Sequence, residues 1–149
     1  MGCTASNPEE NLVKKALRNR FKVHRSGAII KFDKSCAWKD HIHDLEKQCG
    51  IDNKIKFVLW YDKGCWNVQS VTIEPSSSVG RNPLKEEWIG RSSFDLGEVT
   101  GDLEIHYVHP SGFSGFARNY ESALKMATLS LIYSQEHISN FHGSHYIFT

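Results

Sequence analysis

Residues 55–73, with the sequence IKFVLWYDKGCWNVQSVTI, decide the fold of this chain. Two runs rich in β-branched and aromatic residues, Ile55 to Tyr61 and Cys65 to Ile73, are joined by Asp62-Lys63-Gly64. This pattern is typical of a β-hairpin. Because the first run is at least partly apolar on both of its faces, we expect its strand to lie inside a sheet.

Further strands are expected before and after this hairpin. The alternation of apolar residues in Val23 to Phe32 predicts a short extended hairpin around Ser26-Gly27, and Leu103 to Val108 is typical of one more strand. The sheet should therefore contain strands from three separate parts of the chain.

Three helices are predicted from apolar periodicity and capping residues. Asn7 and Pro8 open the first, Trp38 to Cys49 has helical spacing, and Arg118 to Gln135 is apolar on most faces, which is typical of a core helix. Together with the strands, they predict an α+β fold, a single domain in which a mixed β-sheet with a central antiparallel hairpin is packed by helices.

Length and composition indicate one globular domain. The 149 residues are 40% apolar, and a chain of this size can bury a substantial core. We expect the domain to span residues 9–135, between an N-terminal segment, 1–8, and a tail, 136–149. The net charge of +1 does not indicate a nucleic-acid binder. Basic residues nevertheless cluster near the N-terminus: Lys14, Lys15, Arg18, Arg20, Lys22 and Arg25.

The sequence also bears on the cellular compartment. No apolar run approaches the roughly 18 residues of a membrane span, and no secretory signal follows Met1, so we expect a cytosolic or nuclear protein with free thiols. The opening residues MGCTAS fit N-myristoylation at Gly2, with Cys3 beside it as a palmitoylation site. They predict peripheral membrane association, against the alternative of an incidental start sequence.

The strongest local motif is VHPSGFSGF, residues 108–116, a glycine-containing turn that we expect to join a strand to the N-terminus of the core helix. Backbone amides at such a junction suit a phosphate or another anion, and His109, Ser111 and Arg118 could add donors. The alternative is a turn that needs glycine only for its backbone geometry.

Other patterns suggest chemistry, and each has a structural alternative. DHIHD, residues 40–44, contains possible metal ligands, but His41 and His43 point to nearly opposite sides of a helix, which favours a solvated face and no metal site. Cys36 and His41 suggest a nucleophile pair, yet Cys36 also fits a small buried residue. The four tryptophans could stack on bases or fill a core.

Four blocks of the sequence are similar to motifs of one protein family. CAWKDH (36–41) is similar to C-P-W-K-x-H, WNVQSV (66–71) to W-x-x-Q-x-V, RNPLKEEWIG (81–90) to an arginine, proline and W-x-G segment, and VHPSGFSG (108–115) to V-H-x-S-G-F-x-G-G. From about Val13 to Leu131 the chain thus resembles the C-terminal part of the melanocyte-proliferating-gene family of DHH-type exonucleases. Phe116 stands where that family has the second loop glycine.

The resemblance implies binding rather than hydrolysis. In that family an N-terminal domain holds a divalent metal, whereas the C-terminal domain binds substrate through its glycine-rich loop, and only the latter is matched here. We therefore expect a non-catalytic domain without cofactor or metal that contacts nucleic acid, a nucleotide phosphate or a separate DHH-type catalytic chain. A membrane-tethered scaffold and a hydrolase using its own cysteine or histidines are the alternatives. The expected ligand-binding residues are Cys36, Trp38, Lys39, His41, Gln69, Arg81, His109, Ser111, Gly112, Gly115 and Arg118.

Overall fold

The computed structural model describes residues 7–147, and side chains as far as residue 134. In chain order its elements are α1 (Pro8–Arg18), α2 (Arg20–Val23), β1 (Ile29–Phe32), the 3-10 turn η1 (Trp38–Asp40), α3 (Ile42–Gln48), β2 (Phe57–Asp62), β3 (Cys65–Ser70), the 3-10 turn η2 (Glu86–Trp88), α4 (Ser93–Thr100), β4 (Ile105–Val108), β5 (Ser114–Ala117) and α5 (Tyr120–Ile147).

The strands form one mixed sheet in the order β1-β2-β3-β5-β4. Strand β1 is parallel to β2, and the other three pairs are antiparallel. The β2–β3 hairpin turns at Lys63 and Gly64, whose φ angles of 52° and 81° are those of a type I′ turn. The predicted α+β domain with this hairpin inside a mixed sheet is confirmed.

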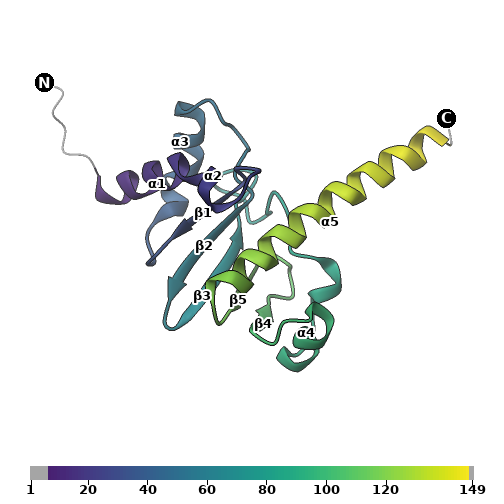
Figure 1. Ribbon diagram of the computed structural model, residues 1–149. Coiled ribbons are helices and arrows are strands. Elements are labelled where there is room, and N and C mark those ends of the chain that lie inside the picture. The colour runs from purple at the N-terminus through teal and green to yellow at the C-terminus, as the bar shows by residue number, and fades with distance from the viewer. Residues whose placement is uncertain (1–6, 148–149) are drawn as a thin grey trace, which may run out of the picture.

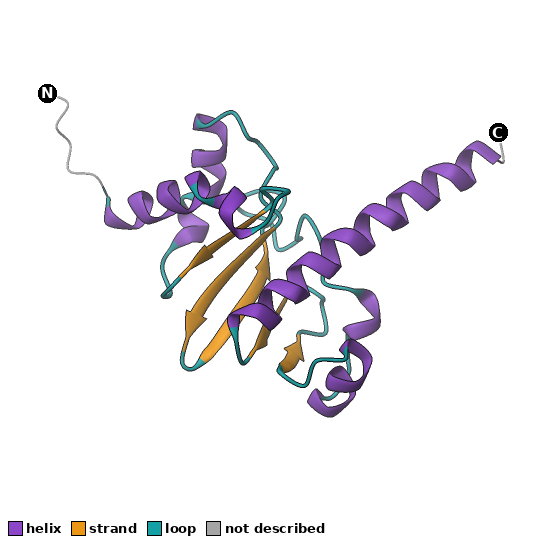
Figure 2. Cartoon of the chain, in the orientation of Figure 1, coloured by secondary structure: helices purple, strands orange, loops and turns teal. Residues whose placement is uncertain are grey.

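Helices cover the two faces of the sheet unequally (Figures 1 and 2). One face, with Phe57, Leu59 and Val68, packs against α5 through Met126 and its neighbours. The other face packs against α1, η1 and α3 on the β1–β2 side, where a second apolar cluster forms. On the β3–β5 side the same face lines a pocket.

The predicted hairpin over Val23 to Phe32 is wrong. Residues 20–23 are helical, His24 to Gly27 form a turn, and β1 pairs in parallel with β2. Gly27 has a φ of +69° and lies against the ring of Phe21, so this glycine belongs to the turn between α2 and β1 and not to a β-hairpin.

The last helix starts later and runs further than the sequence predicts. It begins at Tyr120, not Arg118, because residues 114–117 are a strand, and it continues to Ile147 through most of the predicted tail. Its C-terminal part projects from the rest of the molecule (Figure 1). None of the described helices is both long and apolar enough to cross a bilayer.

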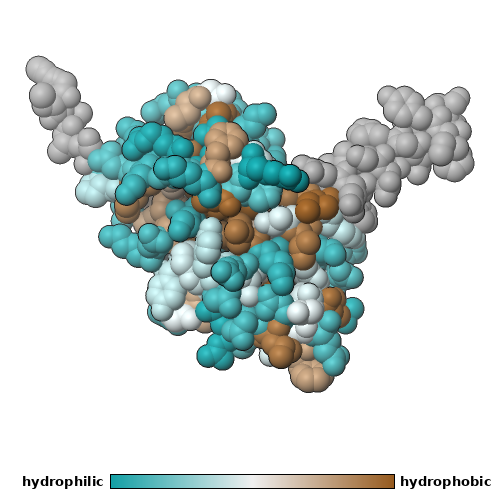
Figure 3. Space-filling model, viewed as in Figure 1, coloured by the Kyte–Doolittle hydropathy of each residue, from teal (hydrophilic) through white to brown (hydrophobic). Residues whose placement is uncertain are grey.

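The surface view in Figure 3 is mainly hydrophilic, with separate apolar patches. Phe94 and Leu103, on and just after α4, are the most exposed large apolar side chains at 70% and 72%.

Candidate functional site

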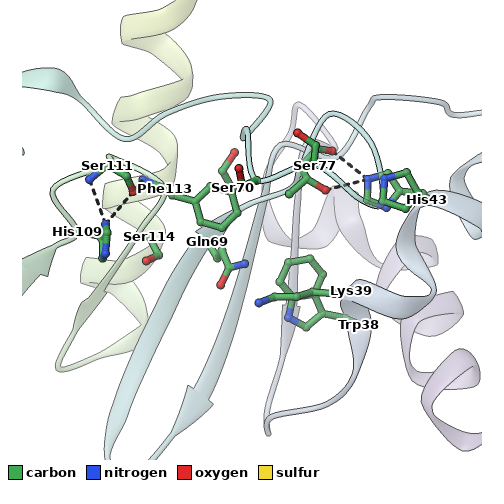
Figure 4. A pocket seen from close by; sticks show the side chains of 13 residues that line it. Trp38, Lys39, His43, Gln69, Ser70, Ser77, His109, Ser111, Phe113 and Ser114 are labelled. Carbon is green, nitrogen blue, oxygen red and sulfur yellow. Dashed lines mark hydrogen bonds between the residues drawn. The ribbon is translucent and has the colours of Figure 1, made fainter.

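A pocket of about 530 Å³ opens on the partly uncovered face of the sheet. Three segments surround it: η1 with the start of α3, the serine-containing loop that follows β3, and the turn between β4 and β5 (Figure 4). We call this hollow the central pocket. Five of the residues predicted from the sequence line it: Trp38, Lys39, Gln69, His109 and Ser111.

The turn from His109 to Phe113 is held by its own hydrogen bonds. The Ser111 amide donates to His109 Nδ1 at 3.1 Å, the Gly112 amide to the His109 carbonyl at 2.8 Å, and the Phe113 amide to Ser111 Oγ at 3.2 Å. Because Nδ1 accepts a hydrogen bond, the ring proton of neutral His109 lies on Nε2, which has no hydrogen-bond partner among the described residues. His109 therefore offers one donor to a ligand.

These bonds contradict the predicted anion site made of backbone amides. Three successive amides of the turn are already used, and strand β5 separates the turn from α5, whose first turn is capped by the Asn119 side chain at 2.8 Å from the Ser122 amide. The prediction failed because the pattern did not reveal a strand as short as β5.

The two predicted glycines have structural roles. Gly112 has a φ of +75°, which favours glycine. Gly115 lies within β5, where a Cβ atom would come within 2.3 Å of the Tyr107 carbonyl oxygen. Arg118 is exposed at the far end of β5 from the turn, so it does not join the pocket.

Arg81 also has a structural role. Its guanidinium makes a two-armed ion pair with Glu46 at 2.6 and 2.7 Å and donates to the Ile55 carbonyl at 2.8 Å. The side chains of Arg81 and Glu46 are 4% and 1% exposed. The predicted ligand donor therefore ties α3 to the loop behind the central pocket.

Cys36 and His41 do not line the central pocket. Burial, and secondarily the Glu9 carboxylate, raise the pKa of the Cys36 thiol, which disfavours the thiolate that a nucleophile needs. Among residues 7–134 no three His, Cys, Asp or Glu side chains gather as metal ligands.

The sequence analysis missed several lining residues. His43 was predicted on a solvated face, but it is buried and its Nε2 lies 2.9 Å from the Thr72 carbonyl. Ser77, Ser78 and Ser114 add hydroxyl groups to the pocket lining. His43 lies three residues before Glu46, so both side chains share one face of α3, and both are buried.

A second turn elsewhere in the molecule has the same hydrogen-bond pattern as the turn at His109. In His24-Arg25-Ser26-Gly27 the Ser26 amide donates to His24 Nδ1 at 3.2 Å, and the Ala28 amide donates to Ser26 Oγ at 3.1 Å. Gly27, like Gly112, has a positive φ. This turn joins α2 to β1 and does not line the central pocket.

A second hollow, of about 510 Å³, lies beside α1 and β1. Lys15 and Lys22 from the predicted basic cluster line it together with Lys31 and Tyr120. We call it the basic hollow. Gly2 and Cys3, the predicted acylation sites, lie outside the described residues.

Comparison with known proteins places these features in a family. A family model labelled MYG1 exonuclease and described as "Uncharacterised protein family (UPF0160)" matches residues 2–131. The chain is 40% identical to the MYG1 protein of Dictyostelium discoideum over 125 residues, covering 83% of this chain and 38% of that protein.

Two mammalian relatives give the same result. The chain is 41% identical to the MYG1 exonuclease of Bos taurus and 40% identical to that of Homo sapiens over 126 residues, covering 83% of this chain and 33% and 34% of those proteins. The chain thus spans about a third of the length of these relatives. No solved structure matches it. The chain belongs to the MYG1 exonuclease family.

Proposed function

We propose that this chain is a binding domain that holds single-stranded nucleic acid or a nucleotide in the central pocket. The observation that carries the proposal is that three separate sequence blocks contribute residues to one hollow. These residues are Trp38 and Lys39 from the first block, Gln69 from the second, and His109 and Ser111 from the last.

The chemistry of the pocket favours an anionic, hydrogen-bonding ligand. Lys39 supplies a positive charge, His109 Nε2 a donor, and the Gln69 amide both a donor and an acceptor. No carboxylate is among the residues that line the pocket. Phosphate groups with a polar base would find complementary partners here.

We further propose that the chain binds without hydrolysing. The match covers only about a third of the relatives that are named exonucleases. The four motif blocks resemble the C-terminal, substrate-binding part of the DHH-type family. As a second candidate, the domain contacts a DHH-type catalytic part.

Binding is tested with a fluorescently labelled RNA pentamer titrated at several salt concentrations. Lys39→Ala should weaken binding and lower the slope of log affinity against log salt by about 0.7, the value for one phosphate contact on a single strand. Lys54→Ala is the matched control, because Lys54 is exposed and does not line the central pocket. Absence of binding by the wild type, or equal losses in both variants, would contradict the proposal.

A further inference from the structure

The uncovered sheet face carries a row of side chains that runs across four strands. Trp60 on β2 pairs with Asn67 on β3, Asn67 pairs with Phe116 on β5, and Phe116 pairs with Tyr107 on β4. Cross-strand partners project from the same face of a sheet. The row therefore places one short amide side chain between two aromatic rings.

This arrangement leaves an opening. A hollow of about 120 Å³ is lined by Trp60, Asn67, Gln69, Ser114 and Phe116. Trp60 and Phe116 lie two strand spacings apart, about 9.6 Å, and a flat ring in van der Waals contact on both sides needs about 7–8 Å. We call this hollow the ring slot.

The walls of the slot are fixed by neighbouring rings. Trp60 packs against Trp38 with ring centroids 6.0 Å apart, and Phe116 stacks on Tyr107 at 5.4 Å with an interplanar angle of 28°. Phe116, which replaces the second loop glycine of the family pattern, thus lies in strand β5 on the open face of the sheet and not in the turn. Each wall thus packs against a second ring, and Tyr107 also lines the ring slot.

The floor of the slot is an amide. Asn67 Nδ2 lies at 3.5 Å from the Trp60 carbonyl, which leaves its Oδ1 as an acceptor and a second N–H as a donor. Gln69 and Ser114 line both the ring slot and the central pocket, so the two hollows are contiguous. A flat heterocycle with donors and acceptors on its edge fits aromatic walls over an amide floor.

We propose that the ring slot takes one nucleobase of a single strand whose neighbouring phosphate lies in the central pocket beside Lys39. This inference rests on the proposed function and names which part of the ligand enters the ring slot. A base inside a duplex is stacked on its neighbours and cannot enter.

The test compares an RNA pentamer with an abasic strand of equal length and charge. Phe116→Leu, which removes the ring but keeps an apolar side chain, should lower affinity for the pentamer roughly tenfold. It should leave affinity for the abasic strand unchanged. Phe116→Tyr should restore pentamer binding, and Phe94→Leu, which changes an exposed ring on α4, is the matched control.

A second readout does not depend on a variant. A pentamer carrying 2-aminopurine should lose fluorescence on binding the wild-type chain, since the base stacks on aromatic rings, and a duplex of the same length should bind more weakly.

Failure of this inference differs from failure of the proposed function. If Phe116→Leu binds the pentamer like wild type, or if the abasic strand binds as tightly as the pentamer, the ring slot holds no base. If Phe116→Leu instead loses a partner protein while RNA affinity stays constant, the slot receives a protein side chain and the inference is wrong. If neither the pentamer nor the abasic strand binds, both proposals are overturned.

Discussion

The two His-x-Ser-Gly turns share their hydrogen bonds and a glycine with positive φ, but their surroundings differ. In both, the histidine Nδ1 accepts from the serine amide and the serine hydroxyl accepts from the amide two residues on. The first turn packs its glycine on Phe21 and leads into β1, whereas the second borders the central pocket.

Comparing the two turns distinguishes the structural role of the motif, which is to form a turn, from the effect of its location beside a pocket. In both turns the His and Ser side chains are hydrogen-bonded to the backbone of the turn itself. Their presence at residues 109 and 111 therefore does not by itself indicate a ligand. The wall opposite the second turn makes the difference, because it adds Lys39, Gln69, Ser77 and Ser78 to the single donor of His109.

The largest expected effect comes from removing the support of that wall. Arg81→Ala should lower the free energy of unfolding by about 3–5 kcal/mol, because it leaves the Glu46 carboxylate buried without its partner. Lys14→Ala, which breaks the exposed pair with Glu10, should cost at most about 0.5 kcal/mol. Urea denaturation of both variants measures the contrast, and a small loss for Arg81→Ala would mean that the pair does not hold the wall.

Matched histidine variants test the comparison directly. His109→Ala should weaken RNA pentamer binding about threefold to tenfold, since one hydrogen-bond donor to the ligand is lost. His24→Ala should leave the affinity unchanged, although it disrupts the same turn geometry. Equal affinities for the two variants, measured by anisotropy, would show that the position of the second turn has no functional consequence.

Serine variants of the two turns should be affected equally, in contrast to the histidine variants. Ser26→Ala and Ser111→Ala each remove the hydroxyl that accepts from a turn amide, and each should lower the free energy of unfolding by a similar amount, about 0.5–1.5 kcal/mol. Thermal unfolding followed by circular dichroism gives both values. A loss confined to one variant would contradict the structural equivalence of the turns.

The smallest effect concerns pH. Burial, and then the charge of Arg25, lower the pKa of His24 below 6.5, so the folded state binds a proton less readily than the unfolded chain. Stability contributed by this group is present above pH 6.5 and falls as the pH drops through the folded pKa. The melting temperature of His24→Asn should therefore fall less than that of the wild type when the pH is lowered from 7.5 to 5.5. An equal fall in both proteins would assign the pH dependence to other groups.

Two regular parts of the fold could be predicted because their sequence signals are local. The β2–β3 hairpin follows from its alternating residues and from Gly64 in the turn, and the core helix follows from its apolar faces. Strand β5 was missed because Ser114 to Ala117 has only four residues and includes a glycine, whose role depends on the nearby Tyr107 carbonyl.

The candidate site was predictable only in part, for the same reason. The motif blocks identified Trp38, Lys39, Gln69, His109 and Ser111, but no local pattern says that Arg81 would be neutralised by Glu46, 35 residues away. The row from Trp60 to Tyr107 depends on strand order and register, which could not be predicted from local sequence patterns.

The central claim, that ligand binding occurs in the central pocket, is tested most directly by NMR. Isotopically labelled protein is titrated with the unlabelled RNA pentamer, and amide and side-chain shifts are followed. The account predicts the largest changes at Gln69, His109 to Ser114 and the Trp60 indole, with His24 to Gly27 unchanged. Largest changes at Lys15, Lys22 and Lys31 would assign binding to the basic hollow and contradict the account.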